Sequence, residues 1–109
     1  MKKTDHINSN DVIFLVMYDI SDNYTRRTVV DYLLREGCLR IQRSIFMGNL
    51  PFCKMQNIAR TLEDIHEGSS SDDSYIIMPL RKESIGAMVI CGDRRNIDMI
   101  LRRQDIVFL

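Results

Sequence analysis

The run from Val12 to Ile20, Val-Ile-Phe-Leu-Val-Met-Tyr-Asp-Ile, constrains the fold of this chain more than any other segment. A short, unbroken apolar stretch rich in β-branched and aromatic residues is typical of a strand buried on both faces. The run ends on a carboxylate, Asp19, and polar residues follow at 21–23. A rigid strand would fix this carboxylate beside a loop with room for a ligand. The alternative interpretation is that Asp19 only helps to cap the helix that follows.

The chain has 109 residues, which is the size of one domain, so we expect a single domain over residues 1–109 with a flexible tail at 1–11. Fifteen basic and fifteen acidic side chains cancel, and no overall field predicts binding to nucleic acid. The basic residues nevertheless come in adjacent pairs such as Arg26-Arg27, whereas acidic residues gather between Glu63 and Asp73. Basic faces can therefore exist on a neutral molecule.

Three cysteines, at positions 38, 53 and 91, are odd in number and lack Cys-x-x-Cys spacing. This usage indicates reduced thiols in a cytoplasmic protein, and neither a disulfide framework nor a zinc site. The polar start of the chain lacks the apolar core of a signal peptide, and no run approaches the ~20 apolar residues of a membrane helix. We therefore expect no membrane association.

Spacing and cap residues predict the order of the elements. A helix is expected from Asp22 or Asn23 to Gly37, because Asp and Asn are good N-caps and Gly favours helix ends. Extended chain is expected over Leu39–Leu50, with a bulge or bend near Arg43-Ser44 where the alternation fails. The remaining expected elements are a helix over Pro51–Gly68, strands at Ser74–Leu80 and Ile85–Cys91, one or two helical turns at 97–101, and a closing strand at Ile106–Leu109.

This order predicts an α+β fold, a ferredoxin-like βαββαβ-type sandwich with an extra C-terminal strand. One face of the sheet takes both helices. The other face has no third layer in a domain of this size, so we expect a homodimer to cover it. The apolar residues at 106–109 would add to a sheet edge, that of a second protomer being one option.

Two motifs together resemble the small core subunit of CRISPR systems, which we call the Cas-two family. The first is an apolar strand ending Tyr18-Asp19-Ile20, followed by a helix that opens with Arg26. The second is the pattern Arg-x-Gln-x-Ser-x-Phe-x-Gly, in which Arg40, Gln42, Ser44, Phe46 and Gly48 stand here. The resemblance extends from Val12 to Leu109. Two departures are a shorter basic run at Arg27-Thr28 and a longer start.

The resemblance implies a ferredoxin-like homodimer in which the strand-end aspartates, here Asp19, face each other. Paired carboxylates suit Mg²⁺, or Mn²⁺, and such an ion would stabilise charge on a scissile phosphate. The catalytic residues implied are Asp19 and Tyr18, with Asp19 as the metal ligand. The residues assigned to nucleic acid, either duplex DNA or single-stranded RNA, are Arg26, Arg27, Arg40, Arg43 and Phe46. The Phe46 ring either stacks on a base or packs at the dimer face.

The implied function is a CRISPR adaptation subunit that binds nucleic acid, carries an endonuclease site and bridges two Cas-one integrase dimers. The sequence leaves three alternatives open. The first is a non-catalytic architectural bridge, which needs only phosphate contacts. The second is a toxin-like ribonuclease of the same fold, and the third is a ferredoxin-like ligand-sensing domain without a nucleic-acid partner.

Overall fold

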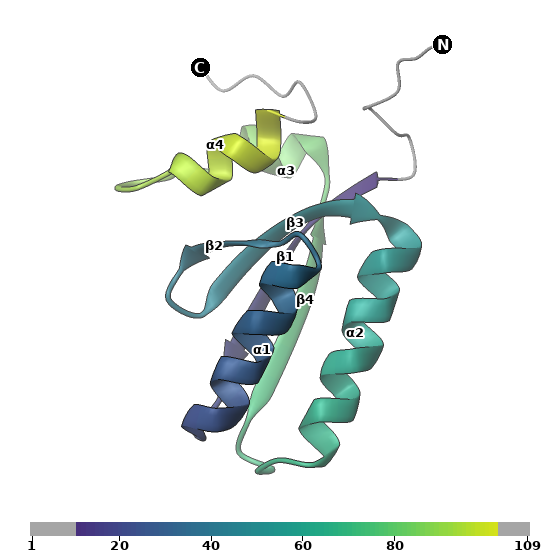
Figure 1. The fold of residues 1–109 in the computed structure, drawn as a ribbon. Coiled ribbons are helices and arrows are strands. Elements are labelled where there is room, and N and C mark those ends of the chain that lie inside the picture. Colours follow the sequence, from purple (N-terminus) through teal and green to yellow (C-terminus); the bar gives the residue numbers. More distant parts are fainter. Residues whose placement is uncertain (1–10, 103–109) are drawn as a thin grey trace.

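The computed structural model describes residues 11–102 (Figure 1). The elements in chain order are β1 (Asp11–Asp19), α1 (Asn23–Arg35), β2 (Leu39–Gln42), β3 (Ile45–Pro51), α2 (Phe52–Glu67), β4 (Ser74–Leu80), α3 (Lys82–Gly86) and α4 (Arg95–Arg102). The tail at 1–10 and the closing strand expected at 106–109 lie outside the described residues. Within residues 11–102, no helix is both long and apolar enough to cross a membrane.

The four strands form one antiparallel sheet in the order β2-β3-β1-β4. Strand β1 is central, and Phe14 pairs with Gly48 of β3 on one side and with Pro79 of β4 on the other. Proline is tolerated at this place because β4 is an edge strand of the described sheet. The order β1-α1-β2-β3-α2-β4 confirms the ferredoxin-like α+β prediction.

The bend predicted near Arg43-Ser44 is confirmed as the turn of a hairpin. Strand β2 ends at Gln42 and β3 begins at Ile45, so the expected extended segment folds back on itself. The pairing register shifts between Arg40 and Gln42, which places a bulge just before the turn. The Tyr18 backbone N–H donates to the Ser44 carbonyl at 3.1 Å and ties the turn to the central strand.

The strand predicted over Ile85–Cys91 is wrong. Residues 82–86 form the short helix α3, and no regular element follows until Arg95. The Ile85 N–H donates to the Arg81 carbonyl at 3.0 Å, which is a helical bond, and the Ile85 side chain is fully buried. Ile85 is buried in the core on the open side of the sheet, and Met88 and Ile90 pack against the same cluster. These apolar residues are therefore partly buried without belonging to a strand. The helical turns expected at 97–101 are confirmed as α4.

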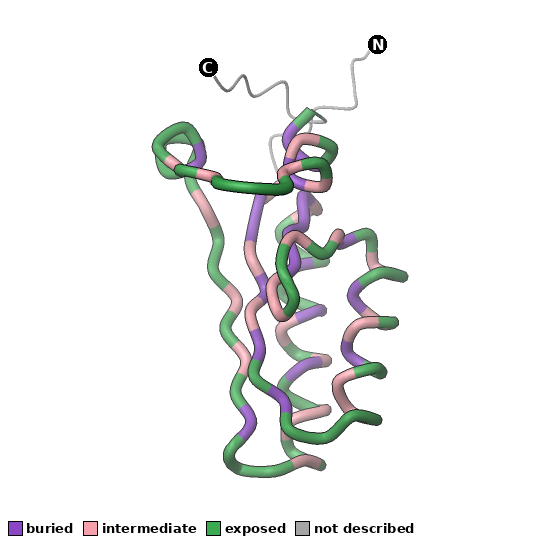
Figure 2. Tube along the Cα trace, turned by 90° about the vertical axis from the view of Figure 1, so that its left-hand side faces the viewer, coloured by how far each residue is buried: buried purple, intermediate pink, exposed green. Residues whose placement is uncertain are grey.

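Strand alternation divides the apolar residues between two cores. Phe14, Val16 and Tyr18 of β1 point toward α1 and α2, on what we call the helix face of the sheet. Ile13 of β1 and Met47 of β3 point to the opposite side, which we call the open face, and pack there against α3 and α4. Figure 2 shows both long helices on one side of the strands, with their outer surfaces mostly exposed.

The described residues cover only part of the open face. Helix α4 contacts β2 and β3, while Ile76 and Met78 of β4 remain 56% and 42% exposed. Leu15 and Met17 of the central strand are half-buried beside them. Within residues 11–102, an apolar strip on the β1–β4 side of the open face is therefore left uncovered.

Close packing in the core explains why a glycine stands at position 48 of the second motif. A Cβ at this position would lie 2.6 Å from Phe14 Cζ and 3.0 Å from Cys38 Sγ, and all three residues are in the interior. Gly48→Ala should therefore lower the free energy of unfolding by about 1–3 kcal/mol through overpacking. Gly86→Ala is the control, because nothing lies within 4 Å of a Cβ there. Chemical denaturation of both variants checks this, and equal stability would contradict it.

Candidate nucleic-acid interface

Helix α1 begins at a well-formed cap, and that cap is Asp22. Its carboxylate accepts from the Thr25 backbone N–H at 2.7 Å and from the Thr25 hydroxyl at 2.8 Å. The backbone hydrogen bond is the main cause that lowers the pKa of Asp22. The interpretation of Asp19 as the helix cap is therefore wrong, and this leaves its carboxylate without that structural role.

Arg26 is held at the end of the central strand. Its Nη1 donates to the Ile20 carbonyl at 2.9 Å, and its Nη2 contacts the Asn23 side chain. A cation in the first helical turn opposes the helix dipole, which favours negative charge there. Arg26 and Arg27 thus gain nothing from the dipole, whereas an anion bound beside them would be favoured by both the dipole and the guanidinium groups.

Arg40 reaches the same region from β2. Its Cζ lies 5.4 Å from the centre of the Phe46 ring, a cation–π contact that places the guanidinium on the helix face. The Phe46 ring is fully buried in the core under α1 and α2, 6.3 Å from the Tyr18 ring. The prediction that Phe46 contacts nucleic acid, like its placement at the dimer face, is wrong for the described chain, because the ring has no exposed surface and packs under the helices.

These residues line one groove between the start of α1 and the β2–β3 hairpin, with a volume of about 700 Å³. Its lining is Tyr18, Asn23, Arg26, Arg27, Val30, Arg40, Arg43 and Ser44. The four arginines predicted to bind nucleic acid are all present in this lining, and no carboxylate of residues 11–102 is. We call this feature the arginine groove. It presents fixed positive charge to an anion.

Tyr18 and Asp19 lie on opposite sides of the sheet. Tyr18 points to the helix face, where it is 6% exposed and its hydroxyl donates to the Arg43 carbonyl at 3.4 Å. Successive residues of a strand point to opposite faces, so exposed Asp19 lies on the side of the open face. Its strand neighbour on β4 is Ser74. The two residues predicted to be catalytic are therefore separated by the sheet.

One chain does not build a complete metal site at Asp19. No group of three or more His, Cys, Asp or Glu side chains comes together anywhere in residues 11–102. A single exposed carboxylate fits Mg²⁺ only if water, a substrate phosphate or a second carboxylate completes the coordination, since Mg²⁺ keeps several waters and is held by one or two protein carboxylates.

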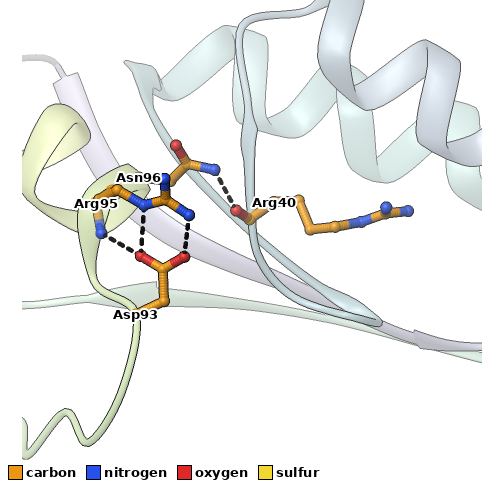
Figure 3. Close-up of polar contacts among 4 residues, drawn as sticks. All are labelled: Arg40, Asp93, Arg95 and Asn96. Atoms are coloured by element: carbon orange, nitrogen blue, oxygen red, sulfur yellow. Dashed lines mark hydrogen bonds and ion pairs between the residues drawn. The ribbon is translucent and has the colours of Figure 1, made fainter.

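Asn96, which no sequence pattern indicated, holds the backbone of Arg40 in place. The Asn96 side chain of α4 donates from Nδ2 to the Arg40 carbonyl at 2.6 Å (Figure 3). Asp93 accepts from Arg95 Nε at 3.0 Å and from Arg95 Nη2 at 2.6 Å, and this hydrogen bonding holds the pKa of Asp93 well below its usual value. The Arg40 side chain runs away from α4 in the same view. Asn96 lies 56 residues from Arg40, so no local pattern could indicate this contact.

Comparisons with known proteins were consistent with this geometry. Residues 12–88 match the family described as CRISPR associated protein Cas2, which is the Cas-two family. A CRISPR-associated endoribonuclease Cas2 of Pyrobaculum aerophilum is 29% identical over 89 residues, which cover 78% of this chain and 96% of that protein. A CRISPR-associated endonuclease Cas1/endonuclease Cas2 fusion of Thermoproteus tenax is 38% identical over 58 residues, 53% of this chain and 22% of the fusion.

Among solved structures, a hypothetical protein from Thermus thermophilus superposes with a TM-score of 0.56 at 25% identity. The match covers 65% of this chain and 83% of that protein. It supports the ferredoxin-like α+β fold.

Proposed function

The chain belongs to the Cas2 family and is a CRISPR adaptation subunit, and on that premise we propose that it binds nucleic acid through the arginine groove. The observation that carries this proposal is the gathering of Arg26, Arg27, Arg40 and Arg43 in one groove without a carboxylate. Guanidinium groups suit phosphate because their planar N–H donors match its oxygens.

The groove provides contacts for a phosphate backbone rather than for bases. Its one aromatic lining residue, Tyr18, is almost completely buried, so the lining offers no exposed ring for base stacking. Arginine contacts to phosphates position a duplex but carry no sequence information. We therefore expect binding with little sequence preference and with affinity that falls as salt is added.

Removing single arginines tests this mode of binding. Arg27→Gln and Arg43→Gln should each weaken binding to a duplex DNA probe and reduce the slope of log affinity against log salt by about one unit. Arg60→Gln is the matched control, because Arg60 is exposed on α2 and does not line the groove. Fluorescence anisotropy over a salt series measures both quantities. If the control reduces the slope as much as the groove variants do, the groove is not the binding site.

We further propose that two protomers associate through the uncovered strip of the open face. The exposed apolar side chains there are Ile76 and Met78, with Leu15 and Met17 beside them. Apolar surface of this kind on a sheet is stabilised by burial against a second copy. Asp19 belongs to the same face, so a two-fold pairing would bring two Asp19 carboxylates toward each other.

A charge in the strip should break the dimer. Ile76→Glu would bury an unpaired carboxylate at the interface, which is costly, so we expect a monomer at micromolar concentration. Val89→Glu is the control, since Val89 is 87% exposed and lies outside the sheet. Sedimentation equilibrium of the parent and both variants gives the masses. A monomeric parent protein would defeat the proposal.

The nuclease activity is proposed for the dimer, with the two Asp19 carboxylates as ligands of Mg²⁺. The bound ion would supply charge stabilisation at a scissile phosphate and lower the pKa of a water. Among the described residues, each protomer would contribute the Asp19 carboxylate, and Arg26 bonds to the Ile20 carbonyl directly after it. An architectural role, with association to a Cas1 protein, is the second candidate, because the arginine groove and Asp19 lie on opposite faces of the sheet.

Asp19→Asn separates these two functions. The amide keeps the shape of the side chain and loses the charge that binds a divalent cation, so cleavage of RNA or DNA in Mg²⁺ should fall by at least about a hundredfold. Dimer mass and DNA affinity should stay within about twofold of the parent, because the arginine groove is untouched. A gel assay with and without EDTA measures cleavage. Undiminished cleavage by Asp19→Asn would place the chemistry at other residues.

A further inference from the structure

A second pocket opens on the helix face between α2 and β4. Strand β4 is the edge of the sheet opposite to β2. We call it the α2–β4 pocket, and its volume is about 400 Å³. Its lining is Ala59, Leu62, Glu63, His66, Asp73, Ser74, Tyr75 and Ile77. None of these residues belongs to the arginine groove, so the pocket needs an explanation of its own.

The floor of the pocket holds buried polar groups with unused hydrogen-bonding capacity. Asp73 is 5% exposed, and its Oδ1 accepts from the backbone N–H and the hydroxyl of Ser21, both at 3.0 Å. Within residues 11–102, its Oδ2 is buried without a hydrogen-bond partner, and so are Nδ1 of His66 and the hydroxyl of Tyr75. Buried polar atoms in folded proteins are nearly always paired, so three such atoms at one pocket indicate a polar ligand.

The charge of the pocket selects a cation. Glu63 and Asp73 are in the lining, and no lysine or arginine of the described part of the chain is. The pocket adjoins the C-terminal half of α2, where backbone carbonyls add negative partial charge. Burial, and after it the negative charge of Asp73, raise the pKa of the Tyr75 hydroxyl, which agrees with a negative local field. A phosphate backbone would be repelled here.

We propose that the α2–β4 pocket receives an arginine side chain of a partner protein. The guanidinium would donate to the free Oδ2 of Asp73, with Glu63 adding attraction from the rim. The aliphatic stem would lie on Leu62 and Ile77, and the flat head would face the Tyr75 ring. The acidic pocket repels nucleic acid, and the arginine groove attracts it. The protein partner and the nucleic acid would therefore bind to different surfaces of the molecule. The proposal holds independently of nucleic-acid binding in the groove.

The test is a titration of the labelled full chain, followed by NMR, with the peptide acetyl-Ala-Arg-Ala-amide. Its twin in which citrulline replaces arginine has nearly the same shape but no charge. The arginine peptide should shift the ring signals of His66 and Tyr75 saturably, and the citrulline peptide should not. Binding to Asp73→Asn should be at least about tenfold weaker, because the amide keeps an oxygen for Ser21 but loses the charge.

Two further variants keep the test decisive if Asp73→Asn folds poorly. Glu63→Gln removes a charge from the exposed rim and should weaken binding about threefold. Glu67→Gln removes the same charge from the same helix but does not line the pocket, so it should leave binding unchanged. Equal shifts from the citrulline peptide, no shifts at His66 and Tyr75, or equal losses in Glu63→Gln and Glu67→Gln would overturn the proposal.

Discussion

The alternation of side chains along β1 is the constraint on which the rest of the structure depends. This strand pairs with β3 on one side and with β4 on the other, so it holds the sheet together and contributes to both cores. Phe14, Val16 and Tyr18 fix the helix face, and Ile13 fixes the side covered by α3 and α4. A shift of one residue in this strand would exchange the two faces completely.

The same alternation separates the chemistry of the molecule. Tyr18 ends on the helix face inside the arginine groove, and Asp19 ends on the side of the open face. The proposed phosphate groove and the proposed paired-carboxylate site therefore lie on opposite faces of the sheet, so a substitution in one should leave the other intact. The acidic α2–β4 pocket adds a third surface at the opposite edge of the helix face, distinct from both.

Local signals in the sequence were enough for most of the fold. The cap at Asp22, the spacing in α2 and the broken alternation at Arg43-Ser44 each act over a few residues, and the structure confirms them. The strand predicted at Ile85–Cys91 was wrong although its apolar residues suit a strand. Ile85 is instead buried beside α4, a contact between segments that no local pattern indicates. Phe46 was given two interpretations, base stacking and packing at the dimer face, and both were wrong because the ring is buried in the core under the helices.

The sequence predicted those residues of the candidate site that belong to a motif, and it did not predict contacts between distant segments. The arginines of α1 were found because they follow the strand-end motif, and those of the hairpin because they lie in the second motif of the resemblance. The fold brings both pairs into one groove. Asn96 was missed because its contact with Arg40 spans 56 residues. The separation of Tyr18 from Asp19 was overlooked as well, although the strand period of two already implies it.

Hydrogen–deuterium exchange with and without duplex DNA tests the central claim, that nucleic acid binds the helix-face groove and not the open face. DNA should protect the backbone amides of residues 23–30 and 39–44, which carry the arginine groove. Amides of β4 at 74–78 should exchange at the same rate in both samples, since the proposed dimer already covers that strip. Protection centred on 74–78, with 23–30 and 39–44 unchanged, would contradict the account.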